Sequence, residues 1–227
     1  MRLISFIDGE RGYCTLVDGA EGGVVLRLGA GEPLRAESPQ PAEEGRAGLD
    51  SDAGSVEVSW SPAGPMLEFG LNGSGLSIYP VAASGSDPAG SLSGPGVACD
   101  LPDGGWSAAR SVWAITAKSR LIVLVALRPE DSREHGEEVV GAARIMPGED
   151  PLAYVEPLLS TEYDEAGVHT RATLELWSED DPLAERGAGT RIAGGATTTP
   201  YGRLEAARFA WAIRGTAAVG GYEILTP

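Results

Sequence analysis

The stretch LIVLVAL, Leu121–Leu127, contains seven apolar residues in a row and decides the class of fold. A run of this length has the size of a strand, and an extended chain sends its apolar side chains to both faces of a sheet. A strand that is apolar on both faces is covered on both sides. We therefore expect Leu121–Leu127 to form a central strand of a β-rich core.

Other segments alternate in the way that half-buried strands do. In SVEVSW, Val56, Val58 and Trp60 alternate with polar residues, and the pair MLEFGL and LSIYPV then flanks the turn NGSG. VHTRATLELW, residues 168–177, alternates over a longer distance. GRLEAARFAWAI, residues 202–213, fits a strand or a helix, and we favour the strand because an RG turn leads into another β-like segment.

Turn-forming residues fill much of the remaining chain, which contains 32 Gly and 16 Pro in 227 residues. Residues 31–54, 83–96 and 178–202 lack apolar periodicity, so we expect exposed loops there. The rest supplies about ten to twelve strands with no alternation of strands and helices, which predicts an all-β, antiparallel barrel or two-sheet sandwich. We expect an N-terminal β half, residues 1–105, and a C-terminal β half, residues 106–227, within one continuous β domain.

The charge balance excludes several classes of partner. With 17 Lys and Arg against 33 Asp and Glu, the net charge is -16, so phosphate-rich nucleic acids and anionic membranes are repelled. No apolar run approaches the roughly 18 residues of a membrane helix, and Asp8 interrupts the first apolar run, so we expect a cytoplasmic protein without a secretory signal. Cys14 and Cys99 are expected to be free thiols, and no metal or other cofactor is predicted.

The segment VHTRATLELW supplies the main candidates for a functional site. At a period of two, His169, Arg171, Glu175 and Trp177 share one face of the strand. A histidine beside a carboxylate can transfer a proton, so His169 and Glu175 are catalytic candidates. Arg171 and Trp177 are the corresponding ligand-binding candidates. The alternative is that this face is hydrated surface, as is common in antiparallel sheets.

Three further residues complete the set of candidates. His135 lies in the charged segment SREHGEE and is a catalytic candidate if this turn folds over a cavity, although solvated turns of this kind are common. Tyr163 is a ligand-binding candidate within the turn-like YDEAG. Trp211 is another, because tryptophan gives an apolar pocket a large contact area and a polar N–H. The chain contains no nucleophile elbow and no phosphate-binding or dinucleotide-binding motif in the required context.

The C-terminal half shows a family resemblance. The order LIVLVALRPE, REHGEEVVGAARI, STEYDEAGVHTRATLELW and RFAWAIRGTAAVGGYEI resembles lipocalin-like proteins grouped with carotenoid 1,2-hydratases and related hydroxysteroid-dehydrogenase-like domains. The resemblance covers residues 106–227 and rests on an aromatic-x-Trp strand followed by a Gly-rich hairpin. It implies a lipocalin-like barrel and an apolar small-molecule ligand, while no catalytic motif of the family can be matched residue by residue.

Three functions remain open at this point. The first is a lipocalin-like protein that binds an apolar metabolite and hydrates, isomerises or cyclises it without a cofactor. The second is a non-catalytic carrier with the same cavity, and the third is a β-sandwich interaction module whose acidic surface meets a basic partner. An inward-facing His169 and Glu175 would favour the first two, and a histidine and carboxylate in hydrogen-bonding reach would favour the enzyme. The ligand and the oligomeric state remain open.

Overall fold

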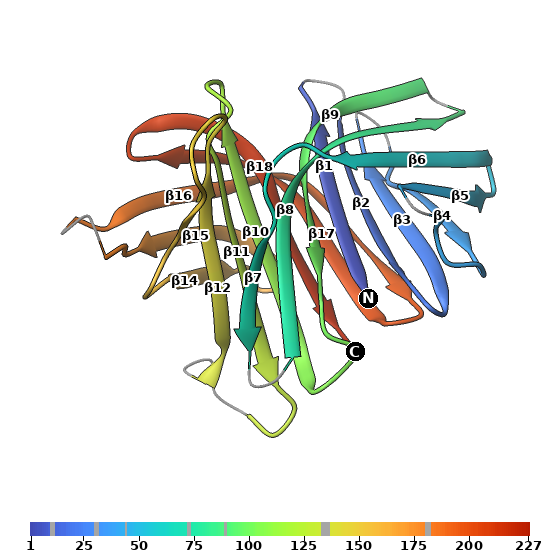
Figure 1. Cartoon of the computed structure of the whole chain (residues 1–227). Helices are drawn as coiled ribbons and strands as arrows, with labels where there is room; N and C mark the ends of the chain where they lie inside the picture. The colour runs from blue at the N-terminus through green and yellow to red at the C-terminus, as the bar shows by residue number, and fades with distance from the viewer. Residues whose placement is uncertain are drawn as a thin grey trace.

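The computed structural model describes residues 1–227 except positions 10–11, 30–31, 44, 72–73, 89, 133–136 and 180–182. The described residues form eighteen strands in two nine-stranded antiparallel sheets, the first from residues 2–100 and the second from residues 106–226 (Figure 1). The all-β prediction is therefore confirmed. The grouping of both halves into one domain stays a prediction, although the change of sheet falls between Asp100 and Trp106.

The first sheet closes into a barrel. Its strands in spatial order are β6 (Gly54–Pro62), β5 (Arg46–Ser51), β4 (Leu34–Ser38), β3 (Gly22–Leu28), β2 (Gly12–Gly19), β1 (Arg2–Asp8), β9 (Gly90–Asp100), β8 (Ser74–Asp87) and β7 (Leu67–Leu71). Strand β6 also pairs with β8, from Glu57↔Ser86 to Pro62↔Val81. This pairing joins β6, at one end of the sheet, to β8 and closes the ring, while β7 extends from the other side of β8.

The second sheet stays open but curls. Its strands in spatial order are β13 (Leu152–Ala153), β12 (Val139–Ile145), β11 (Leu121–Pro129), β10 (Trp106–Thr116), β18 (Thr216–Thr226), β17 (Gly202–Ile213), β16 (Glu185–Thr199), β15 (His169–Leu176) and β14 (Leu158–Tyr163). The backbone N–H of Tyr154 donates to the carbonyl of Ala142, and that of Val155 donates to the carbonyl of Trp177. The connection between β13 and β14 therefore ties β12 to the end of β15.

Buried apolar side chains form three clusters. The first fills the barrel interior and includes Phe6 and Trp60. The second lies between the two sheets, where β1, β2 and β3 meet β17 and β18, and includes Trp113 and Val123 (Figure 1). The third covers the inner, concave face of the second sheet and includes Phe209. Each sheet thus has its own core, and a third core lies at the joint, which is the region where the two sheets meet.

The strands with strong apolar patterns form as predicted. Leu121–Leu127 lies in β11 and is buried throughout. In β6, Val56, Val58 and Trp60 are buried, while the residues between them are exposed. Residues Gly202–Ile213 form strand β17 and not a helix. The local apolar pattern was sufficient in these cases because burial on one or both faces follows directly from it.

The prediction of loops over residues 31–54, 83–96 and 178–202 is wrong. These segments contribute β4, β5, the β8–β9 hairpin and β16, which is why the strand count exceeds ten to twelve. Small residues are required in part of this region, since a Cβ on Gly94 or Gly96 would collide with the carbonyls of Ile7 or Ser5. Glycine here allows β9 to approach β1 closely, a demand that the apolar pattern does not reveal.

The two cysteines are buried free thiols, as expected. Cys14 lies in the barrel interior and Cys99 lies between the sheets. Burial raises the pKa of each thiol to about 12, so both remain protonated at neutral pH. The described part of the chain contains no helix with the length and apolarity that a membrane span requires.

Candidate functional site

The inner face of the second sheet combines small residues with large rings. The small side chains buried on this face are those of Ala114, Ala126, Ala142, Ala172, Ala207 and Ala218. A Cβ on Gly189 of β16 would lie 2.6 Å from Cε3 of Trp211. Glycine and alanine therefore leave room for aromatic side chains to lie against the sheet.

Four rings meet on this face and form what we call the ring cluster: His169, Phe209, Trp211 and Tyr222. The ring centroid of His169 lies 5.8 Å from that of Phe209 and 4.7 Å from that of Tyr222. Phe209 lies 5.5 Å from Trp211. The cluster joins β15, β17 and β18, and these separations are typical of aromatic packing.

His169 reaches this face because of an irregularity in β15. Arg171 pairs with Glu162 and His169 pairs with Tyr163, so Thr170 is an extra residue with no partner on β14. Such a bulge reverses the direction of the side chains that precede it. The expectation that His169 shares a face with Arg171, Glu175 and Trp177 is therefore wrong: His169 is buried inside, whereas Arg171 is exposed.

The imidazole of His169 is enclosed and has no hydrogen-bond partner in the part of the chain that the structure describes. Its side chain is 1% exposed, and neither Nδ1 nor Nε2 is hydrogen-bonded to a described residue. The nearest carboxylate is Oε2 of Glu205, 3.7 Å from Nδ1. Burial, with a further contribution from the positive charge of Arg191, lowers the pKa of His169. The ring is therefore neutral at pH 7 and has one nitrogen that can accept a proton.

Two further polar groups of the ring cluster face the same interior. Nε1 of Trp211 is buried and has no partner among the described residues. The hydroxyl of Tyr222 lies 2.7 Å from Oγ1 of Thr161 on the edge strand β14. Burial raises the pKa of Tyr222 to about 12, so this hydroxyl stays neutral and can donate a hydrogen bond.

A buried ion-pair cluster lies beside Tyr222. The guanidinium of Arg110 on β10 pairs with Glu138, and Nη2 of Arg128 lies 3.0 Å from the other oxygen of Glu138. The positive charge of Arg110 acts on Tyr222 against the effect of burial. Arg110 and Arg128 therefore both contact the carboxylate of Glu138, which holds these three side chains together at this end of the inner face.

Among the other predicted residues that the structure describes, Trp211 belongs to the ring cluster and Tyr163 lies beside it, as the register partner of His169. Glu175 is ion-paired with Arg186 at 3.1 Å on the outer face. Arg171 lies 3.8 Å from Glu162 and is well exposed, and Tyr163 is 47% exposed. Trp177, directly after β15, is only partly buried. His135 lies outside the described residues. The functional roles proposed for these residues stay predictions.

The residues that sequence reasoning missed are Tyr222, Thr161, Glu205, Arg110 and Glu138. Arg110 stands two positions before Val112, and Glu205 two positions before Ala207, on the inward faces of β10 and β17. A charged residue in register with an apolar face is a recognisable signal. Tyr222 and Thr161 carried no such signal, because their contact joins strands that are distant in the sheet.

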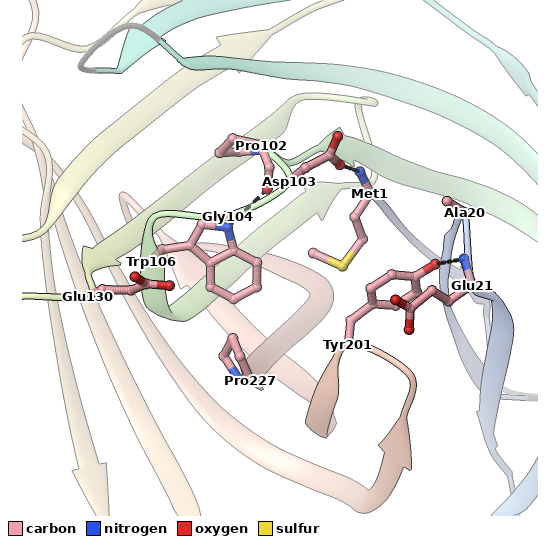
Figure 2. Close-up of a pocket in the computed structure, with 10 residues that line it drawn as sticks. All are labelled: Met1, Ala20, Glu21, Pro102, Asp103, Gly104, Trp106, Glu130, Tyr201 and Pro227. Atoms are coloured by element: carbon pink, nitrogen blue, oxygen red, sulfur yellow. Dashed lines mark hydrogen bonds and ion pairs between the residues drawn. The ribbon is translucent and has the colours of Figure 1, made fainter.

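Apart from the ring cluster, the structure has an open pocket of about 370 Å³ where the two sheets meet (Figure 2). The side chain of Met1 extends between the rings of Trp106 and Tyr201. Nε1 of Trp106 donates to the carbonyl of Pro102 at 3.0 Å, and the hydroxyl of Tyr201 accepts from the backbone N–H of Glu21 at 2.8 Å. Because these polar groups are already bonded, the pocket offers mainly ring and aliphatic surface.

The described residues contain no group of three or more His, Cys, Asp or Glu that could hold a metal ion. His169 and Glu205 are one pair, and Tyr222 supplies a neutral hydroxyl. This arrangement can move a proton and hold an oxygen atom within an apolar enclosure.

Solved structures resemble this chain over nearly its whole length. Kievitone hydratase from Nectria haematococca superposes with a TM-score of 0.65 at 8% identity, covering 99% of this chain and 88% of that chain. A protein from Nitrosomonas europaea whose structure carries the name AttH superposes with a TM-score of 0.62 at 10% identity, covering 98% of this chain and 91% of that chain. No protein-family profile and no curated protein sequence matches the chain.

At these identities the likeness shows the fold alone. The fold is the lipocalin-like one seen in kievitone hydratase, which confirms the resemblance inferred from residues 106–227. The structural likeness also extends over the N-terminal barrel, where the sequence showed no such signal. A fold hosts many activities, so function has to be argued from the site.

Proposed function

We propose that the chain binds an apolar small molecule on the inner face of the second sheet and adds water to it, or removes water from it, without a cofactor. One observation carries this proposal: the buried nitrogens of His169 and Trp211 have no hydrogen-bond partners among the described residues. Each unsatisfied buried group costs about 1–3 kcal/mol, so polar atoms of a ligand would recover that free energy. The lipocalin-like fold, shared with a hydratase, supports the same proposal.

The chemistry follows from the three acid–base groups. During water addition to a double bond conjugated to a carbonyl group, neutral His169 takes a proton from water as the water oxygen bonds to carbon. Glu205, 3.7 Å from Nδ1, stabilises the imidazolium, and the Tyr222 hydroxyl donates to the enolate oxygen. His169 then returns its proton to the adjoining carbon, so no other reagent is consumed. Water elimination is the reverse.

Entry to the ring cluster requires a local opening because His169 and Tyr222 are closed to solvent. The edge strand β14 is the element we expect to move, since it pairs only with β15. Its Thr161 contacts Tyr222 directly, and its Leu158 is 59% exposed. Ligand binding would then replace the Thr161–Tyr222 hydrogen bond.

The first test is native mass spectrometry of the protein purified from its own host, followed by thermal-shift measurements with terpenoid, polyketide and lipid panels. We expect a co-purifying apolar molecule that changes in mass by one water during incubation. His169→Gln and Glu205→Gln should abolish that change, whereas Glu175→Gln, on the outer face, should preserve it. A ligand-free spectrum together with no thermal shift across the panels would refute the binding site.

A carrier function is the second candidate, and one distance favours it. The 3.7 Å between His169 and Glu205 exceeds hydrogen-bonding reach, so the pair is not assembled for proton transfer without the ligand. Catalytic hydrogen bonds are often long before substrate binds, and for that reason we place the enzyme first. Tight binding with no change in the mass of the bound molecule would establish the carrier.

A further inference from the structure

The far end of the inner face holds a separate pocket. Strand β15 starts at His169 in the ring cluster and ends at Leu176, which lines an open pocket of about 180 Å³ that we call the Glu185 pocket. Its polar walls include Arg144, Tyr154 and Glu185, and its apolar walls are Leu152, Leu176 and Leu183. The charges come from different strands, so the curl of the sheet creates the site.

Glu185 is the unusual group in this pocket. It is only 4% exposed, and its Oε2 accepts a hydrogen bond from the Tyr154 hydroxyl at 2.8 Å and pairs with Arg120. Its other oxygen, Oε1, is buried and has no partner among the described residues. A carboxylate oxygen in this position lacks a donor. A ligand that supplies a hydroxyl group would satisfy it without cancelling its own negative charge.

Arg144 gives the pocket its excess charge. It lies on the inner side of β12, is only partly exposed and makes no ion pair with any residue that the structure describes. Arg144 and Arg120 both act electrostatically on Tyr154, which places the two cations near the same point. Among the described residues, Glu185 balances one of them, Arg120. The pocket therefore favours a ligand with one negative charge.

We propose that the Glu185 pocket binds a small carboxylic acid with a hydroxyl on the adjacent carbon and a short branched alkyl chain. The carboxylate would pair with Arg144, the hydroxyl would donate to Oε1 of Glu185, and the alkyl chain would lie against Leu152, Leu176 and Leu183. The pocket measures about 180 Å³, about half of the 370 Å³ of the pocket where the two sheets meet, so it suits a small ligand of this kind. This ligand is smaller and more polar than the molecule proposed for the ring cluster.

Calorimetric titration with three related acids tests the assignment without changing the protein. Alpha-hydroxyisocaproate should bind saturably, and isocaproate, which lacks only the hydroxyl, should bind about tenfold more weakly because Glu185 loses its donor. Leucine should also bind more weakly, because its ammonium group cancels the net negative charge that the pocket favours. Equal binding of the first two acids, tighter binding of leucine, or no saturable binding would each overturn the proposal.

Matched variants locate the binding. Arg144→Gln should weaken alpha-hydroxyisocaproate about tenfold. Arg186→Gln removes the same charge from the outer face of β16, where the side chain is 74% exposed, and should leave the affinity unchanged. An unaffected Arg144→Gln variant would overturn the assignment. His169→Gln should not alter this affinity, so failure of the Glu185 pocket and failure of the ring cluster are separate results.

Discussion

The barrel interior and the inner face of the second sheet are both buried, yet they treat polar groups differently. The centre of the barrel is filled by side chains such as Phe6 and Trp60, and charges near its ends are paired, as Arg27 is with Asp87. On the inner face of the second sheet, His169 has no hydrogen-bond partner among the described residues. Nε of Arg27 also lacks a described partner, but its guanidinium is ion-paired, whereas both ring nitrogens of His169 lack a described hydrogen-bond partner. Buried groups in a structural core are normally satisfied, which is why the proposed ligand site is placed on the second sheet.

The difference follows from closure. The β6–β8 pairing closes the first sheet into a ring, and its interior is a packed core. The second sheet curls without closing, and alanine side chains lie among larger ones such as Leu124 and Phe209 on its inner face. Its edge strand β14 pairs only with β15, so we expect this sheet to open locally and admit a molecule that the filled barrel cannot.

Phe6→Ala should have the largest effect on stability. Phe6 is 1% exposed in the barrel interior, and deleting such a side chain costs about 3–5 kcal/mol in the free energy of unfolding. Urea denaturation measures this loss, and binding of small molecules to the ring cluster should persist in the folded protein. A loss below about 1 kcal/mol would mean that the barrel interior is not tightly packed, which would remove the contrast between the halves.

Glu223→Gln should increase stability at neutral pH by about 2–3 kcal/mol. Glu223 lies fully buried between the sheets, its Oε1 accepts from Nε1 of Trp113 at 3.4 Å, and its Oε2 has no described partner. Burial raises its pKa to about 8 from an ordinary value of 4.5. The folded state therefore binds more protons than the unfolded state between these values, and stability falls as the pH rises through this window.

Thermal denaturation of wild type and Glu223→Gln between pH 5 and 9 checks this expectation. The variant should lack the decline in stability that the wild type shows up to about pH 8. Parallel curves for the two proteins would mean that Glu223 is ionised in the folded state. The region between the sheets would then hold a charged side chain, as the ends of the barrel do with Arg27 and Asp87.

Gly189→Ala tests whether small residues are required on the inner face. The added Cβ would lie 2.6 Å from the ring of Trp211, so the ring must move, at a cost of about 1–3 kcal/mol. Binding at the ring cluster should weaken in parallel. Gly48→Ala on β5 is the control, because a Cβ there meets no atom within 4 Å and stability should hardly change. Equal stabilities of the two variants would contradict the packing described for Trp211.

His169→Gln should have the smallest effect, visible mainly in the pH dependence. Burial lowers the pKa of His169, so the unfolded state takes up a proton first as the pH falls. The wild type should therefore lose stability as the pH falls through the ordinary histidine pKa of about 6.5. Urea denaturation at several pH values should show that the free energy of unfolding of His169→Gln falls less than that of the wild type as the pH is lowered. An unchanged slope would indicate that His169 is accessible to protons in the folded state.

Local patterns predicted the parts of the fold that depend on burial alone. Leu121–Leu127 is apolar at every position, so it forms a covered strand wherever it lies in the sheet. In β6, the alternation of Val56, Val58 and Trp60 predicted one buried face, which the structure has. Strand β16 was missed because its Gly-, Ala- and Thr-rich sequence has no apolar period. Its backbone pairs with β15 and β17 along most of its length.

The candidate site was predicted in part. His169 and Trp211 were named from the sequence and lie in the ring cluster. Glu175 was paired with His169 on the assumption of a regular strand, and the bulge at Thr170 separates the two. Glu205 takes that place from β17, which is separated from β15 by β16, because the side chains of His169 and Glu205 meet across β16 on the inner face.

The sequence by itself determined an acidic, all-β chain with covered central strands, because composition and the period of apolar residues act locally. Only the tertiary structure decided which sheet closes, which way His169 faces and which side chains meet Glu185. These depend on strand pairing between residues far apart and on a single extra residue in β15. A shift of one residue sends a side chain to the opposite face, so the site is set by register.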